Sequence, residues 1–137
     1  MPIVYRVDHE ATLVVAAGIG LLTDADVFGY QRDVWSRADV VGYNELIDMT
    51  RVTHFAVPSG DRVRELAALA ARMDDTGSKT LLAVVASADV AFGLGRMFQS
   101  YRQLDRRSNK EVGIFRTMAE ALAFLQIDHP VVMPALP

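Results

Sequence analysis

Residues 79–104 read KTLLAVVASADVAFGLGRMFQSYRQL, and this stretch decides the fold. Its residues 80–86 are apolar apart from one threonine, which predicts a strand buried on both faces. The chain then passes through Ser87-Ala88-Asp89 into a segment with the apolar spacing of an amphipathic helix. A buried strand that leads directly into a helix is typical of an α/β layer. The same unit recurs at 44–73 and 111–125, so the sequence predicts an α/β fold.

Bulk composition narrows the class of protein. The chain has 137 residues, a usual size for one domain. Although 51% of its residues are hydrophobic, no apolar run approaches the roughly 20 residues of a membrane-spanning helix. It has no cysteine, which excludes disulfides and thiolate metal sites. We expect a soluble, cytoplasmic domain. Residues 88–116 hold six basic and three acidic side chains, too sparse a basic patch to predict nucleic-acid binding.

The order of predicted elements gives the architecture. Two β-branched runs, 3–7 and 12–17, form an antiparallel hairpin that ends at the glycines 18 and 20. Further strands are predicted at 44–49, 80–86 and 111–115, and helices at 23–38, 59–73, 89–104 and 117–126, with a loop at 50–58. The order β-β-α-β-α-β-α-β-α predicts a five-stranded, mixed and mostly parallel sheet. The domain spans 1–126, and a proline-rich tail, 127–137, lies extended.

Polar side chains gather where the third strand ends, the edge at which open α/β sheets bind ligands. Asp48, Thr53, His54 and Ser59 follow this strand, and a serine, a histidine and an aspartate are the ingredients of a hydrolytic triad. No Gly-x-Ser-x-Gly elbow accompanies them, and helix capping and turn formation account for each residue. We therefore assign no catalytic residue and keep a small hydrolase as the third hypothesis.

Metal and phosphate sites are not predicted. His9, His54 and His129 lie in separate elements, and none is three or four residues from another ligand. Of the glycine pairs 18/20 and 93/95, the first lacks a third glycine and the second lies within a helical pattern, where glycine permits close packing. We expect no metal and no cofactor.

The helix after the fourth strand carries the predicted contact surface. Its inward stripe is expected to be Val90, Leu94, Met97, Phe98, Tyr101 and Leu104. At 100° per residue, the opposite face holds Phe92, Arg96, Gln99, Gln103 and Arg106. An outward aromatic bordered by arginine resembles the composition of protein interfaces. The alternative is that a neighbouring loop or the tail covers Phe92.

The element order, together with four short strings, resembles the SpoIIAA-like family, a branch of the STAS domains (sulphate transporters and anti-sigma-factor antagonists). The strings are GLLT at 20–23, ELIDMT at 45–50, FGLGRM at 92–97 and EALAFL at 120–125. The resemblance implies a mixed sheet with helices largely on one side. It also implies a non-enzymatic role in binding proteins or small apolar molecules.

The resemblance also singles out Ser59. In the antagonist branch, an Asp-Ser-Ser-Gly motif at the start of the following helix carries a regulatory phosphoserine. The matching residues here are Val57-Pro58-Ser59-Gly60, so the serine and glycine are kept and the preceding acid and serine are replaced. Phosphate at a helix N-terminus meets free amide groups, although Asp61 would repel it. Ser59 is a candidate phosphosite, with helix capping as its alternative role.

These observations lead to a binding module rather than an enzyme. The predicted partner surface consists of Thr53, His54, Ser59, Phe92, Arg96, Gln99 and Gln103. The partner is another protein or a second copy, and apolar helix faces favour a homodimer. The alternative is a carrier of a small apolar ligand such as a lipid, in a pocket lined by Met49, Phe55, Met97 and Tyr101.

Overall fold

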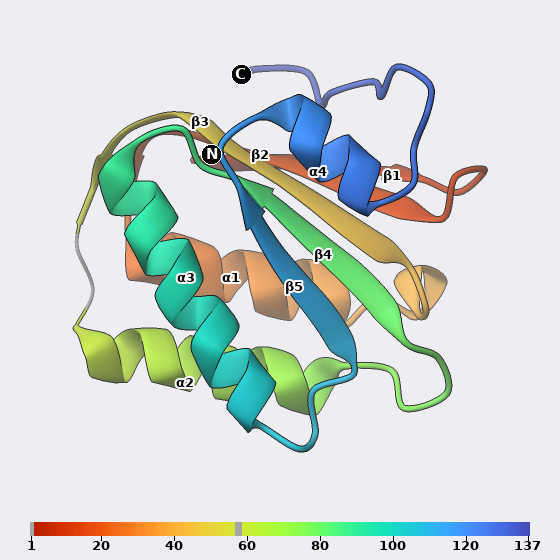
Figure 1. Cartoon of the computed structure of the whole chain (residues 1–137), viewed down its shortest axis with the longest axis horizontal. Coiled ribbons are helices and arrows are strands. Elements are labelled where there is room, and N and C mark those ends of the chain that lie inside the picture. The colour runs from red at the N-terminus through yellow and green to blue at the C-terminus, as the bar shows by residue number, and fades with distance from the viewer. Residues whose placement is uncertain (1, 57–58) are drawn as a thin grey trace.

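The computed structural model describes residues 2–56 and 59–137. The strands are β1 (Ile3–Asp8), β2 (Leu13–Leu22), β3 (Asn44–Phe55), β4 (Thr80–Val85) and β5 (Lys110–Phe115). The α-helices are α1 (Asp24–Trp35), α2 (Gly60–Met73), α3 (Asp89–Leu104) and α4 (Met118–Phe124), and a short 3-10 turn covers Ala38–Val40. The predicted element order is therefore confirmed (Figure 1).

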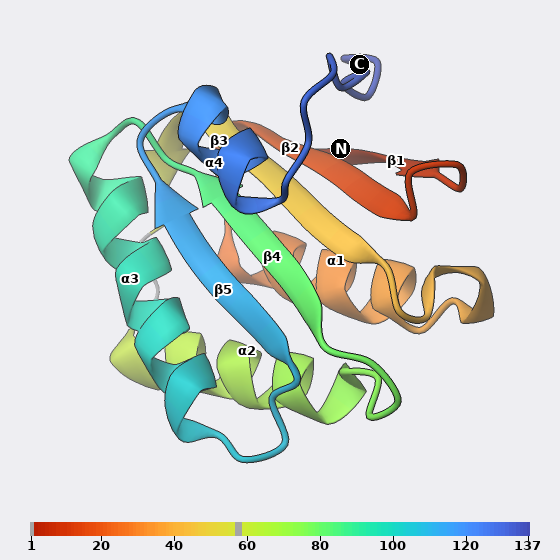
Figure 2. The same cartoon turned by 45° about the vertical axis from the view of Figure 1, so that its right-hand side comes forward.

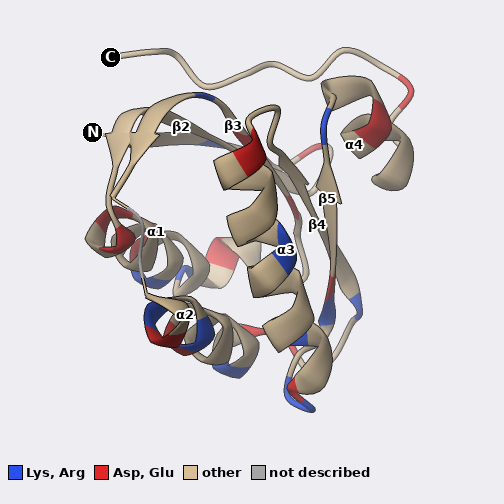
Figure 3. Ribbon diagram, turned by 60° about the vertical axis from the view of Figure 1, so that its left-hand side comes forward, with Lys and Arg blue, Asp and Glu red and all other residues tan. Residues whose placement is uncertain are grey.

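The five strands form one sheet in the order β1-β2-β3-β4-β5. β1 pairs antiparallel with β2, and every other pairing is parallel, as predicted. Each strand–helix–strand connection has the same handedness, and each new parallel strand is added at the same edge of the sheet. Such connections place their helices on the same face. Accordingly α1, α2 and α3 cover one face, while α4 and the C-terminal tail lie on the other (Figure 3).

Strands β2 and β3 are longer than their sequences predicted. β2 continues past Gly18 to Leu22, and β3 continues through the predicted loop to Phe55, because the far ends of these strands pair with each other. Gly20 adopts a φ of +69° and absorbs an irregularity in the pairing, so it does not end the strand. A Cβ on Gly18 would lie 2.8 Å from Val52, so glycine is needed there for close packing.

Residues of β4 show how the sheet divides the core. Leu82 and Val84 face the layer of α1, α2 and α3, whereas Ala83 and Val85 face α4, as the period of two requires. All four are buried, which explains the unbroken apolar run in the sequence. On the second face, side chains of α4 and of the tail, including Val131 and Met133, complete the packing. The tail crosses this face in extended form (Figure 2).

Helix α1 begins as predicted and ends early. Thr23 accepts a hydrogen bond from the Asp26 amide at 3.2 Å, and the Asp26 carboxylate accepts one from the Thr23 amide at 2.9 Å, which makes a complete capping box. The helix ends at Trp35 rather than at Ala38, where the 3-10 turn begins. The ending brings the Trp35 indole toward the start of β3.

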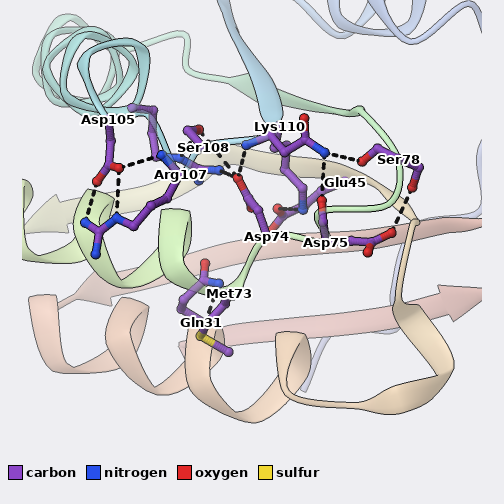
Figure 4. A network of polar contacts seen from close by, with 12 residues as sticks. Gln31, Glu45, Met73, Asp74, Asp75, Ser78, Asp105, Arg107, Ser108 and Lys110 are labelled. Atoms are coloured by element: carbon purple, nitrogen blue, oxygen red, sulfur yellow. Dashed lines mark hydrogen bonds and ion pairs between the residues drawn. The ribbon is translucent and has the colours of Figure 1, made fainter.

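A buried ionic clamp joins three elements at one end of the molecule. Asp74, the C-cap of α2, accepts hydrogen bonds from the Arg102 guanidinium of α3 and, at 2.8 Å, from the Asn109 amide before β5. The Asn109 side chain in turn donates to the carbonyl groups of Asp75 and Ser78 at 2.7 Å. The clamp ties α3 to the end of α2 and to the start of β5, and Figure 4 labels its residues Asp74, Asp75 and Ser78.

Candidate functional site

Three large apolar side chains form a row along the outer face of α3. Val90, Met97 and Leu104 are 54%, 39% and 81% exposed, and their spacing of seven residues places them on one line of the helix. Leu94 and Tyr101 lie half-buried beside this row. The prediction that Val90, Met97 and Leu104 point inward is therefore wrong. We call these three residues the outer row.

The face of α3 that packs on the sheet is made mainly of small residues. Ala91 is buried, and a Cβ on Gly95 would lie 3.1 Å from Ile114 of β5, so the helix axis approaches the sheet closely here. Phe98 and Arg102 continue this face, and Arg102 is buried because it pairs with Asp74. The sequence interpretation gave most weight to large apolar residues. The predicted inward face of α3 is therefore wrong by about 100° around the helix axis, the angle of one residue.

The prediction that Phe92 points away from the core is wrong. It is half-buried and packs against the cluster of Leu82, Val84, Val112 and Ile114. The Arg116 guanidinium lies over its ring, 4.0 Å from the centroid, and is held there by Asp89 at 2.8 Å. Arg116 therefore covers the outer side of Phe92, so the alternative of a neighbouring segment shielding the ring is the one observed.

The polar residues predicted on α3 differ in their surroundings. Arg96 and Gln103 are exposed, whereas Gln99 is half-buried and donates a hydrogen bond to the Val112 carbonyl at 2.7 Å. Arg96 forms no ion pair within the part of the chain that the structure describes. Arg96 and Gln103 therefore remain available beside the outer row, and Gln99 ties α3 to β5.

The residues predicted at the end of the third strand do not act together in the structure. Thr53 and His54 are exposed on the extended part of β3, and Ser59 accepts a hydrogen bond from the Arg62 amide at 3.3 Å as the N-cap of α2. Asp48 accepts one from the Thr50 amide at 2.9 Å. Across the described ranges, no hydrogen bond joins Asp48, His54 and Ser59. Val57 and Pro58 lie outside the described residues.

An apolar cavity of about 150 Å³ lies between the sheet and helices α1, α2 and α3. Met49 and Phe55 line it, as predicted, together with Ile47, Val84 and Phe98. Met97 and Tyr101 do not. Met97 belongs to the outer row, and Tyr101 lines a shallow groove between α2 and α3. The same rotation of α3 explains both errors.

One end of the cavity carries a buried polar cluster, made of Tyr30, Trp35, Glu45 and Lys110. Oε2 of Glu45 accepts hydrogen bonds from the Tyr30 hydroxyl at 2.7 Å and from the Trp35 indole at 3.0 Å. Oε1 of Glu45 accepts one from Nζ of Lys110 at 3.2 Å, and this ammonium lies 3.4 Å from the centroid of the Trp35 ring. Burial first, and the Glu45 carboxylate second, raise the pKa of Tyr30 well above its usual value.

Sequence reasoning missed this cluster. Glu45 and Lys110 begin two strands that are not adjacent, so no local pattern relates them (Figure 4). The available signal was strand alternation, because Glu45 shares a face with Ile47 and a charge on an inward position requires a partner. Lys110 lies one residue before the strand predicted at 111–115, so it was not considered as a strand position.

The three histidines remain separate, as predicted. His9 bonds to the Tyr43 hydroxyl at 2.8 Å, and His129 lies beside Asp128. Among residues 2–56 and 59–137, no three His, Asp or Glu side chains come together in a way that would hold a metal ion. No helix in these ranges combines the length and hydropathy needed to cross a bilayer.

The arrangement of elements matches a solved structure. The crystal structure at 2.25 Å resolution of an uncharacterised DUF3478-family protein from Shewanella loihica PV-4, which has a SpoIIAA-like fold, superposes with a TM-score of 0.56. The match covers 90% of this chain and 93% of that chain at 14% sequence identity. The fold of this chain is SpoIIAA-like. No protein-family model and no curated protein matches the sequence. The SpoIIAA-like fold confirms the architecture that the sequence resemblance implied.

Proposed function

We propose that the chain is a non-enzymatic binding module that contacts a protein partner through the outer face of α3. The outer row carries this proposal, because three large apolar side chains on one line of a helix are exposed to solvent. The row runs from Val90 to Leu104, fourteen residue steps along the helix or about 21 Å. Arg96 and Gln103 are exposed about a quarter turn around the same helix, and an apolar centre flanked by arginine resembles the composition of protein interfaces.

The hydrogen bonds at the end of β3 support a non-enzymatic role. Ser59 caps α2 and the Asp48 carboxylate accepts the Thr50 amide within β3, so two of the three candidate triad members have structural roles. Thr53 and His54 are exposed on the same strand and extend the proposed surface beyond α3. Phosphorylation of Ser59 would add charge to this region and is proposed as a means of control.

Site-specific photo-crosslinking in the source cell tests the partner surface. A crosslinker at Leu104 is expected to capture a defined partner, and one at Val132 is not. Val132 is a matched control because it is a similarly exposed apolar residue in the tail. Leu104→Ser should weaken the captured complex at least tenfold and leave the fold intact. Equal capture from both positions would contradict the proposal.

If the partner is a second copy of this chain, we expect the outer row to mediate self-association. Sedimentation equilibrium of the wild type and of Leu104→Ser measures it directly. A dimer that the substitution dissociates supports a homodimer, and a monomer at all concentrations assigns the row to a different protein.

The apolar cavity between the sheet and the helices favours a second candidate function, a carrier of a small apolar ligand. Its walls come from the sheet and three helices, and apolar side chains provide most of its lining. Ala91 lines the cavity, so Ala91→Leu is expected to fill part of it and abolish uptake of an apolar probe such as toluene. Ala68→Leu makes the same chemical change in the shallow groove between α2 and α3 and should leave uptake unchanged.

A further inference from the structure

We propose that the cavity binds a neutral, single-ring molecule that carries one hydroxyl or N–H group, and that this group donates a hydrogen bond to Tyr30 or Glu45. The inference rests on the carrier candidate above and names its class of ligand. It follows from the size of the cavity, the chemistry of its walls and the direction of the hydrogen bonds at its polar end.

The size of the cavity matches a ligand of about one ring. Its volume is about 150 Å³. An engineered apolar cavity of about 150 Å³ in another protein binds benzene. A long-chain fatty acid occupies several times the volume of benzene, so most of such a lipid would lie outside this space, whereas a single ring fits within it.

The walls of the cavity select an apolar body. Ile47, Val84 and Phe98 represent its sheet and helix sides. Removing a ring from water and placing it against such side chains is favourable in proportion to the apolar area buried. An apolar ring therefore supplies most of the binding free energy.

The polar end of the cavity selects a hydrogen-bond donor. Tyr30 and Glu45 line the cavity, and the donors of Tyr30, Trp35 and Lys110 are already directed at the Glu45 carboxylate. The Tyr30 oxygen gives its proton to Glu45 and keeps a lone pair, and Oε1 of Glu45 accepts one bond, so acceptors remain. A ligand hydroxyl or N–H matches these acceptors.

The charge of the cluster requires the ligand to be neutral. Lys110 neutralises Glu45 at 3.2 Å, and both side chains are buried. A ligand carboxylate would face the Glu45 carboxylate, and a ligand ammonium would compete with Lys110 inside a dry site. Either ion would lose its hydration without gaining a free counter-charge.

Competition between toluene and phenol tests the inference, because the two molecules have similar shapes and differ in one hydroxyl group. Methyl NMR titration of Val84 and Leu82 gives both dissociation constants in the wild type. A purely apolar cavity disfavours phenol, since its hydroxyl is buried without a partner. We expect phenol to bind at least as tightly as toluene.

A triple variant, Tyr30→Phe, Glu45→Met and Lys110→Met, replaces the polar end with apolar side chains of similar size. We expect it to keep toluene and to lose at least tenfold in phenol affinity relative to toluene. If the triple variant does not fold, the ratio of the phenol and toluene dissociation constants in the wild type still tests the inference. That ratio reports whether the cavity offers the phenol hydroxyl an acceptor.

The possible results separate the inference from the carrier function on which it rests. Toluene binding with phenol at least tenfold weaker in the wild type overturns the ligand class and leaves the carrier function standing. Stoichiometric uptake of decanoate that shifts the same methyl groups also overturns the ligand class, in favour of a lipid carrier. Absence of binding by all three probes overturns both.

Discussion

Substitution of Asp74 by alanine tests how α3 is held in place. Asp74 is 6% exposed at its side chain, and its partner Arg102 is 3% exposed. The carboxylate also accepts the Asn109 amide at 2.8 Å, so its removal leaves a buried guanidinium and a backbone donor without this acceptor. The Ser108 hydroxyl still accepts a hydrogen bond from Nε of Arg102 at 3.0 Å, and it carries no charge.

The size of the effect follows from the burial of the pair. Breaking a buried ion pair by removing one member costs about 3–5 kcal/mol, because the other charge stays in a medium of low polarity. The native state of a domain of this kind is stabilised by about 5–15 kcal/mol, so Asp74→Ala should remove at least about a fifth of it. Asp61→Ala is a matched control, since Asp61 pairs with Arg64 at the surface, where such a pair contributes about 0–1 kcal/mol.

Urea unfolding followed by circular dichroism measures both variants. We expect a large fall in the free energy of unfolding for Asp74→Ala and little change for Asp61→Ala. Adding Arg102→Met to Asp74→Ala should restore part of the loss, because the unpaired charge is then removed. A loss within about 1 kcal/mol of the Asp61 control would refute the view that this clamp positions α3.

Two further predictions concern the start of α2 and the polar cluster. Ser59→Ala should lower the free energy of unfolding by about 1 kcal/mol because it removes the N-cap acceptor, and Ser59→Gly by only a few tenths; equal losses in urea unfolding would contradict capping. The raised pKa of Tyr30 contributes stability that is present below pH 10 and lost as pH rises further, with a slope approaching about 1.4 kcal/mol per pH unit. The stability difference between wild type and Tyr30→Phe should therefore shrink above pH 10 in alkaline unfolding titrations, and a constant difference would contradict the raised pKa.

Sequence patterns predicted the local features of the fold because these depend on neighbours in the chain. The hairpin of β1 and β2, the start of α1 at Thr23 and the strand–helix units were all visible as short-range sequence patterns. The distal ends of β2 and β3 were missed because their pairing joins residues about 32 positions apart, such as Ile19 and Arg51. Such pairing leaves no signal in either segment alone.

The site was harder to predict than the fold because it depends on how one helix is rotated. In α3, small residues such as Ala91 and Gly95 mark the side that approaches the sheet, and large residues lie on both sides. As a result, Phe92 packs on the core and the outer row faces solvent, which is the opposite of the prediction. Met97 belongs to the outer row and so does not line the cavity. The predicted pocket residues on β3, which do not depend on this rotation, line the cavity.

The order of strands in the sheet has a consequence for biosynthesis. Because spatial order equals chain order, each strand that leaves the ribosome finds its neighbour already synthesised. The nascent sheet therefore grows at a single edge, one strand–helix unit at a time, and no late segment has to insert between earlier ones. The packing of the second face has to wait until α4 and residues 127–137 have been synthesised.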